Sequence, residues 1–285
     1  MSLLLDHSKL GIQTTLRIDE PDLEELAMAL HSSARKSVSR CEPDMPADLV
    51  WQRSPDGQWQ IGMRGAAWNG ESMTADALYL QTDSLLDDLV REQVQQWPLL
   101  HAGAISDHRR NALVFAGRSG SGKTSLVTAG VLSGFSWLSD ELLCFRQADA
   151  RVIEGFRRNF NLKERGFTAY PETARLQGKW EFVVNDERRR IRFFDPDSLN
   201  GGQFTSQAQL SAIVVPRFDP FEVFPVVEPL VGLELVRELS GELRSAGAAS
   251  FAWLAETVRR VPGYRLRYKN PRAAVEAAVK LFPSG

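Results

Sequence analysis

The sequence predicts an α/β fold in which a mixed sheet carries a phosphate-binding loop, preceded by a smaller N-terminal α+β region. An apolar strand-like run, Ala112–Ala116, leads directly into a glycine-rich loop, Gly117–Thr124, and a proline-free helical segment follows. Strand-like and helix-like segments then alternate towards the C-terminus, as in α/β domains. We therefore expect an N-terminal region at 1–98 and a phosphate-binding domain at 99–285. Because no Pro- or Ser-rich linker separates them, the two should pack together.

The N-terminal region has a strand, two helices and a hairpin as its predicted elements. Leu10–Ile18 alternates as a strand does, whereas Asp22–Ser37 and Ser84–Trp97 have apolar residues at helical spacing. Two alternating runs, at 49–54 and 58–64, flank Pro55-Asp-Gly57, which is a turn signal. This mixture is typical of a small α+β unit.

The C-terminal region contains five strands and four helices that can be assigned from pattern. The segment 151–192 is rich in arginine and has no clear periodicity. Proline near the start of the last helix suits its first turn. The predicted strands are Leu99–Ile105, Ala112–Ala116, Phe135–Ser139 (continuing extended over Leu142–Phe145), Ala212–Pro216 and Tyr264–Tyr268; the predicted helices are Thr124–Ser133, Leu233–Leu243, Phe251–Val261 and Pro271–Phe282.

Composition narrows the possible partners. The net charge of −2 over 285 residues gives no basic excess for nucleic acid, and no apolar stretch is long enough to span a bilayer. The N-terminus lacks the basic start and cleavage site of a signal peptide. Cys41 and Cys144 have no metal-ligand spacing and are expected to be reduced thiols. We therefore expect a cytoplasmic protein with no nucleic-acid or membrane partner.

The glycine-rich loop matches G-x-x-x-x-G-K-[ST] at every fixed position. Glycines let successive backbone N–H groups converge on phosphate oxygens, and the helix that follows adds its positive end. Lys123 supplies a cation for the β- and γ-phosphates, and the Thr124 hydroxyl is a magnesium ligand. The expected cofactors are ATP and Mg²⁺. The expected nucleotide-binding residues are Gly117, Arg118, Ser119, Gly120, Ser121, Gly122, Lys123, Thr124 and Ser125.

Three further side chains are candidates for the chemistry. Asp140 and Glu141 follow a short apolar strand, one helix after the loop, where a carboxylate can reach magnesium or an attacking nucleophile. Most Asp-Glu pairs are solvated turns, so it is this placement that favours function. His101 lies in the strand before the loop strand. A lone histidine among apolar residues is more often a core residue than a functional one.

Taken together, His101-Ala-Gly, Gly117–Thr124 and Trp137–Glu141 resemble the core of the HPr kinase/phosphorylase superfamily. The resemblance is strong over 99–145 and continues more weakly through Phe160–Lys163 and Ala212–Phe218 to Tyr264–Tyr268. It implies a domain of the HPr kinase/phosphoenolpyruvate carboxykinase type, and homo-oligomers occur in that family. The layout, N-terminal region included, is similar to that of HPr-kinase-related proteins of bacterial peptide-modification clusters, some of which phosphorylate a serine at the end of a lasso-peptide precursor.

The resemblance also implies residue roles. Asp140 resembles the aspartate that takes the proton from the attacking hydroxyl, and Glu141 replaces a second aspartate. His101 falls on an active-site histidine near the phosphates. The family's Gly-rich aliphatic signature after the acidic pair has no counterpart in Arg157–Arg165. HPr is therefore not the expected substrate.

Several arginines and lysines could bind a substrate anion, or could equally form a solvated basic face. For Arg188–Arg190 the sequence favours a solvated turn, because acidic neighbours precede it. Arg157, Lys163 and Arg217 remain open between the two interpretations. Arg217 follows a buried strand, and strand ends in such folds often face ligands.

Two functions remain open from the sequence. The first is a kinase that transfers the γ-phosphoryl group of ATP to a hydroxyl acceptor, either a serine in a peptide or a small alcohol or sugar. In this hypothesis Lys123 stabilises the transferred group, Thr124 holds magnesium together with Glu141 or Asp140, and Asp140 deprotonates the acceptor. The second is a nucleotide-dependent binding or regulatory module with only slow ATP hydrolysis. Only the first requires the Asp140 carboxylate near an acceptor oxygen.

Overall fold

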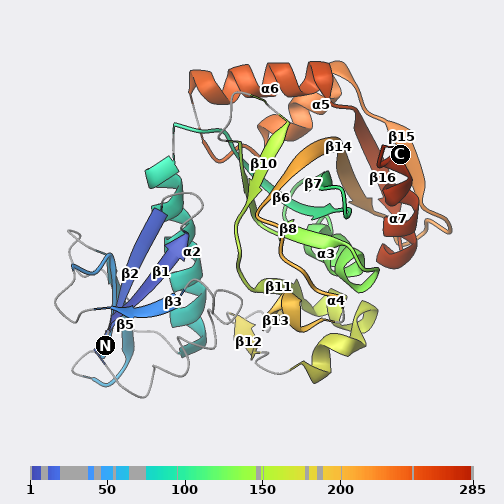
Figure 1. The fold of residues 1–285 in the computed structure, drawn as a ribbon. Helices are drawn as coiled ribbons and strands as arrows, with labels where there is room; N and C mark the ends of the chain where they lie inside the picture. Colours follow the sequence, from blue (N-terminus) through green and yellow to red (C-terminus); the bar gives the residue numbers. More distant parts are fainter. Residues whose placement is uncertain are drawn as a thin grey trace.

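The fold was determined as a computed structural model with side chains. It describes residues 2–7, 12–19, 38–41, 46–53, 56–63, 75–94, 96–145, 149, 151–176, 180–184, 189–199, 201–245 and 247–283. Figure 1 shows an N-terminal sheet with one long helix beside a larger layered body of sheet and helices. Mixed α/β architecture with a mixed sheet is therefore present.

The N-terminal sheet has five strands in the order β3-β1-β2-β4-β5, all antiparallel except the β2–β4 pair. Gly57 has a φ of 80° in the turn between β4 and β5, which confirms the predicted hairpin. The Trp51 indole nitrogen donates to Thr82 Oγ1 at 2.8 Å, which ties the sheet to α2. The elements are β1 (Ser2–His7), β2 (Ile12–Ile18), β3 (Val38–Cys41), β4 (Leu49–Arg53), β5 (Trp59–Met63) and α2 (Ala75–Val94).

The central sheet has eight strands, in the order β10-β9-β6-β7-β14-β16-β15 with β8 also paired to β6. β7, β14 and β16 are parallel to one another, and the remaining pairs are antiparallel. Their carboxyl ends therefore meet at one edge, where ligands bind in such folds. The strands are β6 (Leu99–Ser106), β7 (Asn111–Ala116), β8 (Ser136–Ser139), β9 (Leu142–Cys144), β10 (Val152–Gly155), β14 (Gln207–Phe218), β15 (Val226–Pro229) and β16 (Gly263–Tyr268).

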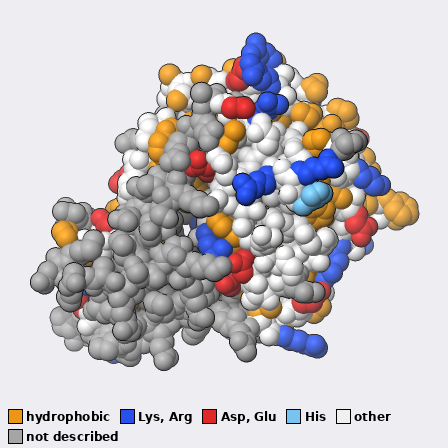
Figure 2. Space-filling view, in the orientation of Figure 1, with side chains coloured by type: hydrophobic (Ala, Val, Ile, Leu, Met, Phe, Trp, Pro, Cys, Tyr) orange, Lys and Arg blue, Asp and Glu red, His pale blue; other side chains and the backbone are white. Residues whose placement is uncertain are grey.

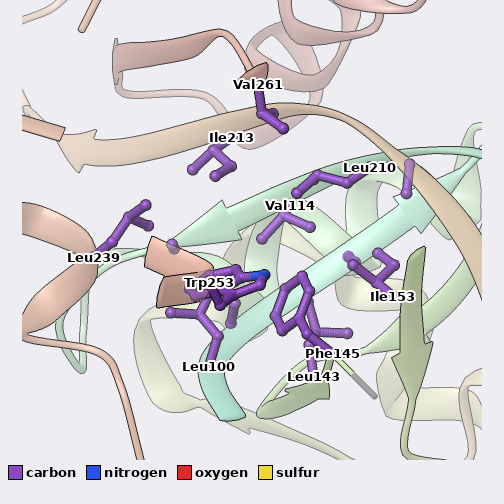
Figure 3. Packing of buried hydrophobic residues seen from close by; sticks show 14 of the residues in the cluster. Leu100, Val114, Leu143, Phe145, Ile153, Leu210, Ile213, Leu239, Trp253 and Val261 are labelled. Carbon is purple, nitrogen blue, oxygen red and sulfur yellow. The ribbon is translucent and has the colours of Figure 1, made fainter. Parts of the chain in front are cut away.

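Helices cover both faces of this sheet, which explains why all eight residues of β6 are buried. On one face the sheet packs against α5 (Gly232–Ser240) and α6 (Ala248–Arg260). Figure 3 shows Trp253 of α6 lying against Phe145 and Leu100 in this layer; the Trp253 and Phe145 rings are 4.2 Å apart between centroids. On the other face, α3 (Lys123–Leu132) and α7 (Pro271–Ala278) complete a second core.

A third, three-stranded sheet lies beside the α3 layer, in the order β11-β13-β12. It accounts for most of the arginine-rich segment that sequence patterns left unassigned. Its strands alternate with short helical turns, so no period is sustained. The elements are β11 (Phe160–Lys163), α4 (Glu164–Ala169), η4 (Pro171–Arg175), β12 (Trp180–Val184), β13 (Arg189–Phe194) and η5 (Pro196–Ser198).

The N-terminal region and the central sheet are in contact. Val90 and Val94 of α2 form a small core with Leu99, Leu142 and Phe156. On the face drawn in Figure 2, the described acidic and basic side chains are interspersed, so neither charge gathers into one large patch there. This distribution agrees with the small net charge.

Element boundaries differ from the sequence predictions at several places. The helix expected at Leu233–Leu243 ends at Ser240, before Gly241, and the last helix ends at Ala278 and continues as a short 3₁₀ turn, η6 (Val279–Leu281). β1, β3 and β15 were not predicted; β3 and β15 have only four residues each. The helix predicted at 22–37 lies outside the described residues.

Candidate functional site

The glycine-rich loop connects β7 to α3 at the carboxyl edge of the parallel strands. Gly120 and Gly122 have φ values of 83° and 101°, which side-chain-bearing residues rarely adopt. A Cβ at Gly122 would lie 1.8 Å from the Tyr268 hydroxyl oxygen, and that hydroxyl donates to the Ser121 carbonyl at 3.1 Å. Tyr268 of β16 thus fixes the loop from beneath, and the loop leads directly into the first turn of a buried helix.

Lys123 is the first residue of α3, and its side chain turns back into the loop. Its ammonium donates to the carbonyls of Gly117, at 2.5 Å, and Arg118, at 3.4 Å. Burial lowers the pKa of Lys123, while Glu141 and nearby acids act in the opposite direction. The lysine therefore lies within electrostatic range of the acidic turn.

The acidic turn joins β8 to β9. Ser139 Oγ accepts hydrogen bonds from the backbone nitrogens of Glu141, at 3.2 Å, and Leu142, at 3.0 Å, which fixes the turn. Asp140 is only 1% exposed, and the Asn161 backbone nitrogen is 3.4 Å from its Oδ2. A Cβ on Gly103 of β6 would be 3.4 Å from the Asp140 Cα. The same Cβ would lie only 2.6 Å from Val127 Cγ2, so the absence of a side chain at position 103 lets α3 lie close against β6 beside this turn.

His101 lies between two carboxylates. Its Nε2 is 3.0 Å from Glu141 Oε1, and its Nδ1 is 2.7 Å from Glu242 Oε2. Burial acts to lower the pKa of His101, but the hydrogen bonds to Glu141 and Glu242 outweigh it and raise that pKa. Burial likewise opposes ionisation of Glu141, yet His101 and Arg158 lower its pKa to about 2. Two acceptors on two ring nitrogens are satisfied together only by an imidazolium.

Glu242 and Arg244 lie at this site although sequence patterns gave no sign of them. Both follow α5 in a segment that runs along β6: His101 N donates to Glu242 O, and Arg244 N donates to Leu99 O, each at 2.8 Å. Arg244 Nη2 is also 2.8 Å from His101 Nδ1. Since that nitrogen carries a proton in the imidazolium, we assign the hydrogen bond to Glu242; Arg244 lies 3.7 Å from the same carboxylate.

The basic residues predicted to bind substrate are not gathered in one place. Lys163 of β11 reaches the glycine-rich loop, where its ammonium donates to Ser119 Oγ at 2.9 Å. Arg157 instead forms an ion pair with Asp197 and lies over the Trp137 ring. Lys163 therefore lies at the glycine-rich loop, whereas Arg157 packs against an aromatic ring and an aspartate elsewhere.

Arg217, at the end of β14, lines a cavity of about 540 Å³ next to the glycine-rich loop. Arg217 forms an ion pair with Glu238, and Arg265 Nη2 lies 3.3 Å from Glu234 Oε2. The cavity therefore lies between the loop and α5. Its lining residues are Arg118, Arg217, Glu234, Arg237, Glu238, Gly241, Glu242 and Arg265.

The donor set beside the loop suits a magnesium ion that is held mainly by phosphate oxygens. The residues available are the hydroxyl of Thr124, which is half-buried at the start of α3, and the ionised carboxylate of Glu141. Magnesium prefers oxygen ligands and is commonly bound through one or two protein groups plus substrate phosphates. The described ranges contain no group of three or more His, Cys, Asp and Glu side chains that could hold a metal ion.

Ser125, the last of the predicted nucleotide-binding residues, is held in place through its backbone carbonyl. Its carbonyl accepts a hydrogen bond from the Tyr170 hydroxyl at 2.5 Å. Tyr170 is fully buried between α4 and η4, and burial raises the pKa of its hydroxyl. Tyr170 and Tyr268 thus anchor the loop and the first turn of α3 from two different elements.

No family model matches the sequence, and no curated protein matches it at a significant level. Among solved structures, the Hpr(Ser) kinase/phosphatase from Coxiella burnetii is similar to this chain at 10% sequence identity, over 64% of this chain and 93% of that chain, with a TM-score of 0.32. A likeness this weak does not indicate a function. Within the described part of the chain, no helix is long and apolar enough to cross a membrane.

Proposed function

We propose that this chain is an ATP- and magnesium-dependent kinase that transfers the γ-phosphoryl group to a hydroxyl acceptor. The observation that carries the proposal is the position of Asp140, a buried carboxylate fixed in a turn within electrostatic range of Lys123. Burying a charged group costs free energy, and buried charged groups cluster at functional sites. A nucleotide sensor would need the loop but no such carboxylate.

The glycine-rich loop is the proposed nucleotide site. The positive φ values of Gly120 and Gly122 support a cradle of backbone N–H groups, and the N-terminal end of α3 adds a positive dipole. Lys123 would leave the loop carbonyls for the β- and γ-phosphates when nucleotide binds. Lys163, already hydrogen-bonded to Ser119, would add a second cation at the outer rim.

Asp140 is the proposed general base. A kinase positions its acceptor hydroxyl beside a carboxylate, which orients the oxygen and accepts its proton as the phosphoryl group is transferred. The nearby Asn161 backbone N–H and the Ser139 hydroxyl limit how far the turn can move. The low exposure of Asp140 keeps water from competing with the acceptor.

Thr124 and Glu141 are the proposed magnesium ligands. With a pKa of about 2, Glu141 is ionised throughout the physiological range. The ion would bridge phosphate oxygens and neutralise charge that develops on the transferred group.

His101 and Arg244 are the proposed further cations of the site. Held as an imidazolium by Glu141 and Glu242, His101 places positive charge beside the acidic turn. Arg244 lies close enough to Lys123 to lower its pKa further. Cations fixed in place before the reaction stabilise a transferring phosphoryl group without reorganisation.

The same residues favour kinship with the HPr kinase/phosphorylase-related P-loop kinases. In that proposal the phosphate-binding domain spans 99–285 and the α+β region 1–98 is an appended unit. Arg157 and Arg217 are predicted substrate residues, but their ion pairs with Asp197 and Glu238 favour a structural role for Arg157 and a cavity role for Arg217.

The proposal is tested by following label from γ-labelled ATP and magnesium into a pool of small alcohols, sugars and Ser-containing peptides. Wild type is run beside Lys123→Ala. Label in an acceptor with wild type and none with the variant supports the kinase. If wild type binds ATP but releases only inorganic phosphate with every acceptor, the nucleotide-dependent binding module replaces it.

A further inference from the structure

The cavity beside the glycine-rich loop has an unusual lining. Of its eight lining residues, all but Gly241 are charged: four are arginines and three are glutamates. None is aromatic or aliphatic. Most small-molecule pockets are largely apolar, so this lining selects for a small, polar, charged ligand.

Two of the four arginines that line the cavity form ion pairs with glutamates of the same lining. Glu238 pairs with Arg217, and Glu234 lies 3.3 Å from Arg265. The third glutamate, Glu242, is already held by His101 on the side of the acidic turn.

The two remaining arginines are Arg118 and Arg237. Neither guanidinium has a carboxylate partner within the part of the chain that the structure describes. Arg118 belongs to the glycine-rich loop, and Arg237 belongs to α5. Two guanidinium groups that face one cavity suit a carboxylate or a phosphate, because each can donate two parallel hydrogen bonds.

The position of the cavity indicates which molecule carries that anion. The nucleotide phosphates are assigned to the loop amides at the start of α3, which belongs to the other helical layer. The cavity lies on the α5 side, and Glu242 connects it through His101 to Glu141 next to Asp140. A ligand in the cavity would therefore extend from α5 towards the acidic turn.

We propose that this cavity binds the anionic group of the phosphoryl acceptor, so that the substrate is a hydroxyl compound that carries a carboxylate or a phosphate. This inference rests on the proposed kinase function. Arg118, which the sequence predicted to bind the nucleotide, would here hold the anion together with Arg237, and the acceptor hydroxyl would extend to Asp140.

Direct binding tests the inference independently of turnover. The protein is saturated with magnesium and a non-hydrolysable ATP analogue, which fills the loop, and titrated calorimetrically with glycerol, glycerate and glycerol 3-phosphate. These probes share a backbone and differ only in the anionic group. At least one anion should bind ten-fold or more tighter than glycerol, and comparison of the two anions distinguishes carboxylate from phosphate.

Arg237→Gln is the decisive variant. Arg237 is an exposed side chain that forms no ion pair with any described residue, so the change should leave folding intact, as circular dichroism would confirm. Losing hydrogen bonds to a charged group should weaken anion binding by about 10- to 100-fold. Arg259→Gln is the matched control, because Arg259 is exposed on α6, pairs with Glu256 and does not line the cavity.

Kinetics then separates this inference from the kinase proposal. With an anionic acceptor, Arg237→Gln should raise the acceptor KM by a similar factor and leave the KM for ATP unchanged. If Lys123→Ala abolishes transfer while Arg237→Gln leaves the acceptor KM unaltered, the kinase stands and the cavity assignment is wrong. If neither anion binds better than glycerol, the assignment is also wrong, whatever the activity.

Discussion

Replacing Glu242 with glutamine isolates the charge that holds His101. The amide keeps an oxygen that can accept from Nδ1, now 2.7 Å from the carboxylate, but it removes the negative charge. Glu242 and His101 are both buried, at 3% and 6% exposure, so solvent screens their interaction little. The substitution should therefore lower the pKa of His101 towards its ordinary value.

The magnitude follows from the change in hydrogen-bond type. A hydrogen bond to a charged group contributes about 1.5–3 kcal/mol, and one between neutral groups about 0.5–1.5 kcal/mol. Glu242→Gln should therefore destabilise the protein by about 1–2 kcal/mol while His101 is protonated. Because the folded-state pKa is raised, this stabilisation is fully present below about pH 6.5, the ordinary pKa of histidine, and is lost as pH rises through the folded-state value.

Two assays measure these effects. NMR titration of ¹⁵N-histidine-labelled protein, which contains only four histidines, gives the pKa of His101 in each protein. Urea denaturation gives the difference in unfolding free energy, which should be largest below pH 6.5 and should shrink as pH rises through the folded-state pKa of His101. A wild-type His101 that titrates at or below pH 6.5, or a variant whose pKa matches wild type, would refute the imidazolium held by two carboxylates.

Three further predictions concern the loop, its rim and the core. Gly122→Ala places a Cβ 1.8 Å from the Tyr268 hydroxyl oxygen at a φ of 101°, so ATP binding measured by fluorescence titration should weaken at least ten-fold; unchanged affinity would show that the loop shape is not required. Lys163→Ala removes the contact with Ser119 and should raise the KM for ATP several-fold without altering thermal stability; an unchanged KM would place Lys163 outside the nucleotide site. Trp253→Ala leaves a cavity in the core beneath α6 and should lower the free energy of unfolding, measured with denaturant, by about 3–5 kcal/mol. A decrease of less than 1 kcal/mol would contradict this packing.

Local sequence patterns were sufficient to predict the elements that position the glycine-rich loop. The apolar run that became β7, the glycine-rich loop and the helix that became α3 are consecutive in the chain, and each follows from its own pattern. The turn holding Asp140 was likewise placed by its short preceding strand, β8. The close packing of α3 on β6 depends on Gly103, because a Cβ there would lie 2.6 Å from Val127 Cγ2, and the sequence alone does not show which helix lies over this strand.

Long-range contacts could not be predicted from the sequence. Glu242 meets His101 across 141 residues, after a helix that periodicity extended three residues too far. Because glycine commonly follows the last helical turn, Gly241 could have been used to predict the end of this helix. Glu242 would then have been predicted to lie outside the helix. Likewise, Lys163 was left open between a solvated face and a ligand site, since only the pairing of β11 with β13 brings it to Ser119.

The central claim is that Asp140 serves phosphoryl transfer and not nucleotide binding. The most direct measurement is the single-turnover rate of phosphoryl transfer from γ-labelled ATP to the acceptor identified in the labelling experiment. Wild type is compared with Asp140→Asn and with Asp149→Asn, a control at an exposed aspartate. Loss of a general base should slow transfer by about 10²- to 10⁴-fold in Asp140→Asn, with ATP affinity within a few-fold of wild type and the control unchanged. Transfer at the wild-type rate by Asp140→Asn, with ATP binding intact, would contradict the account.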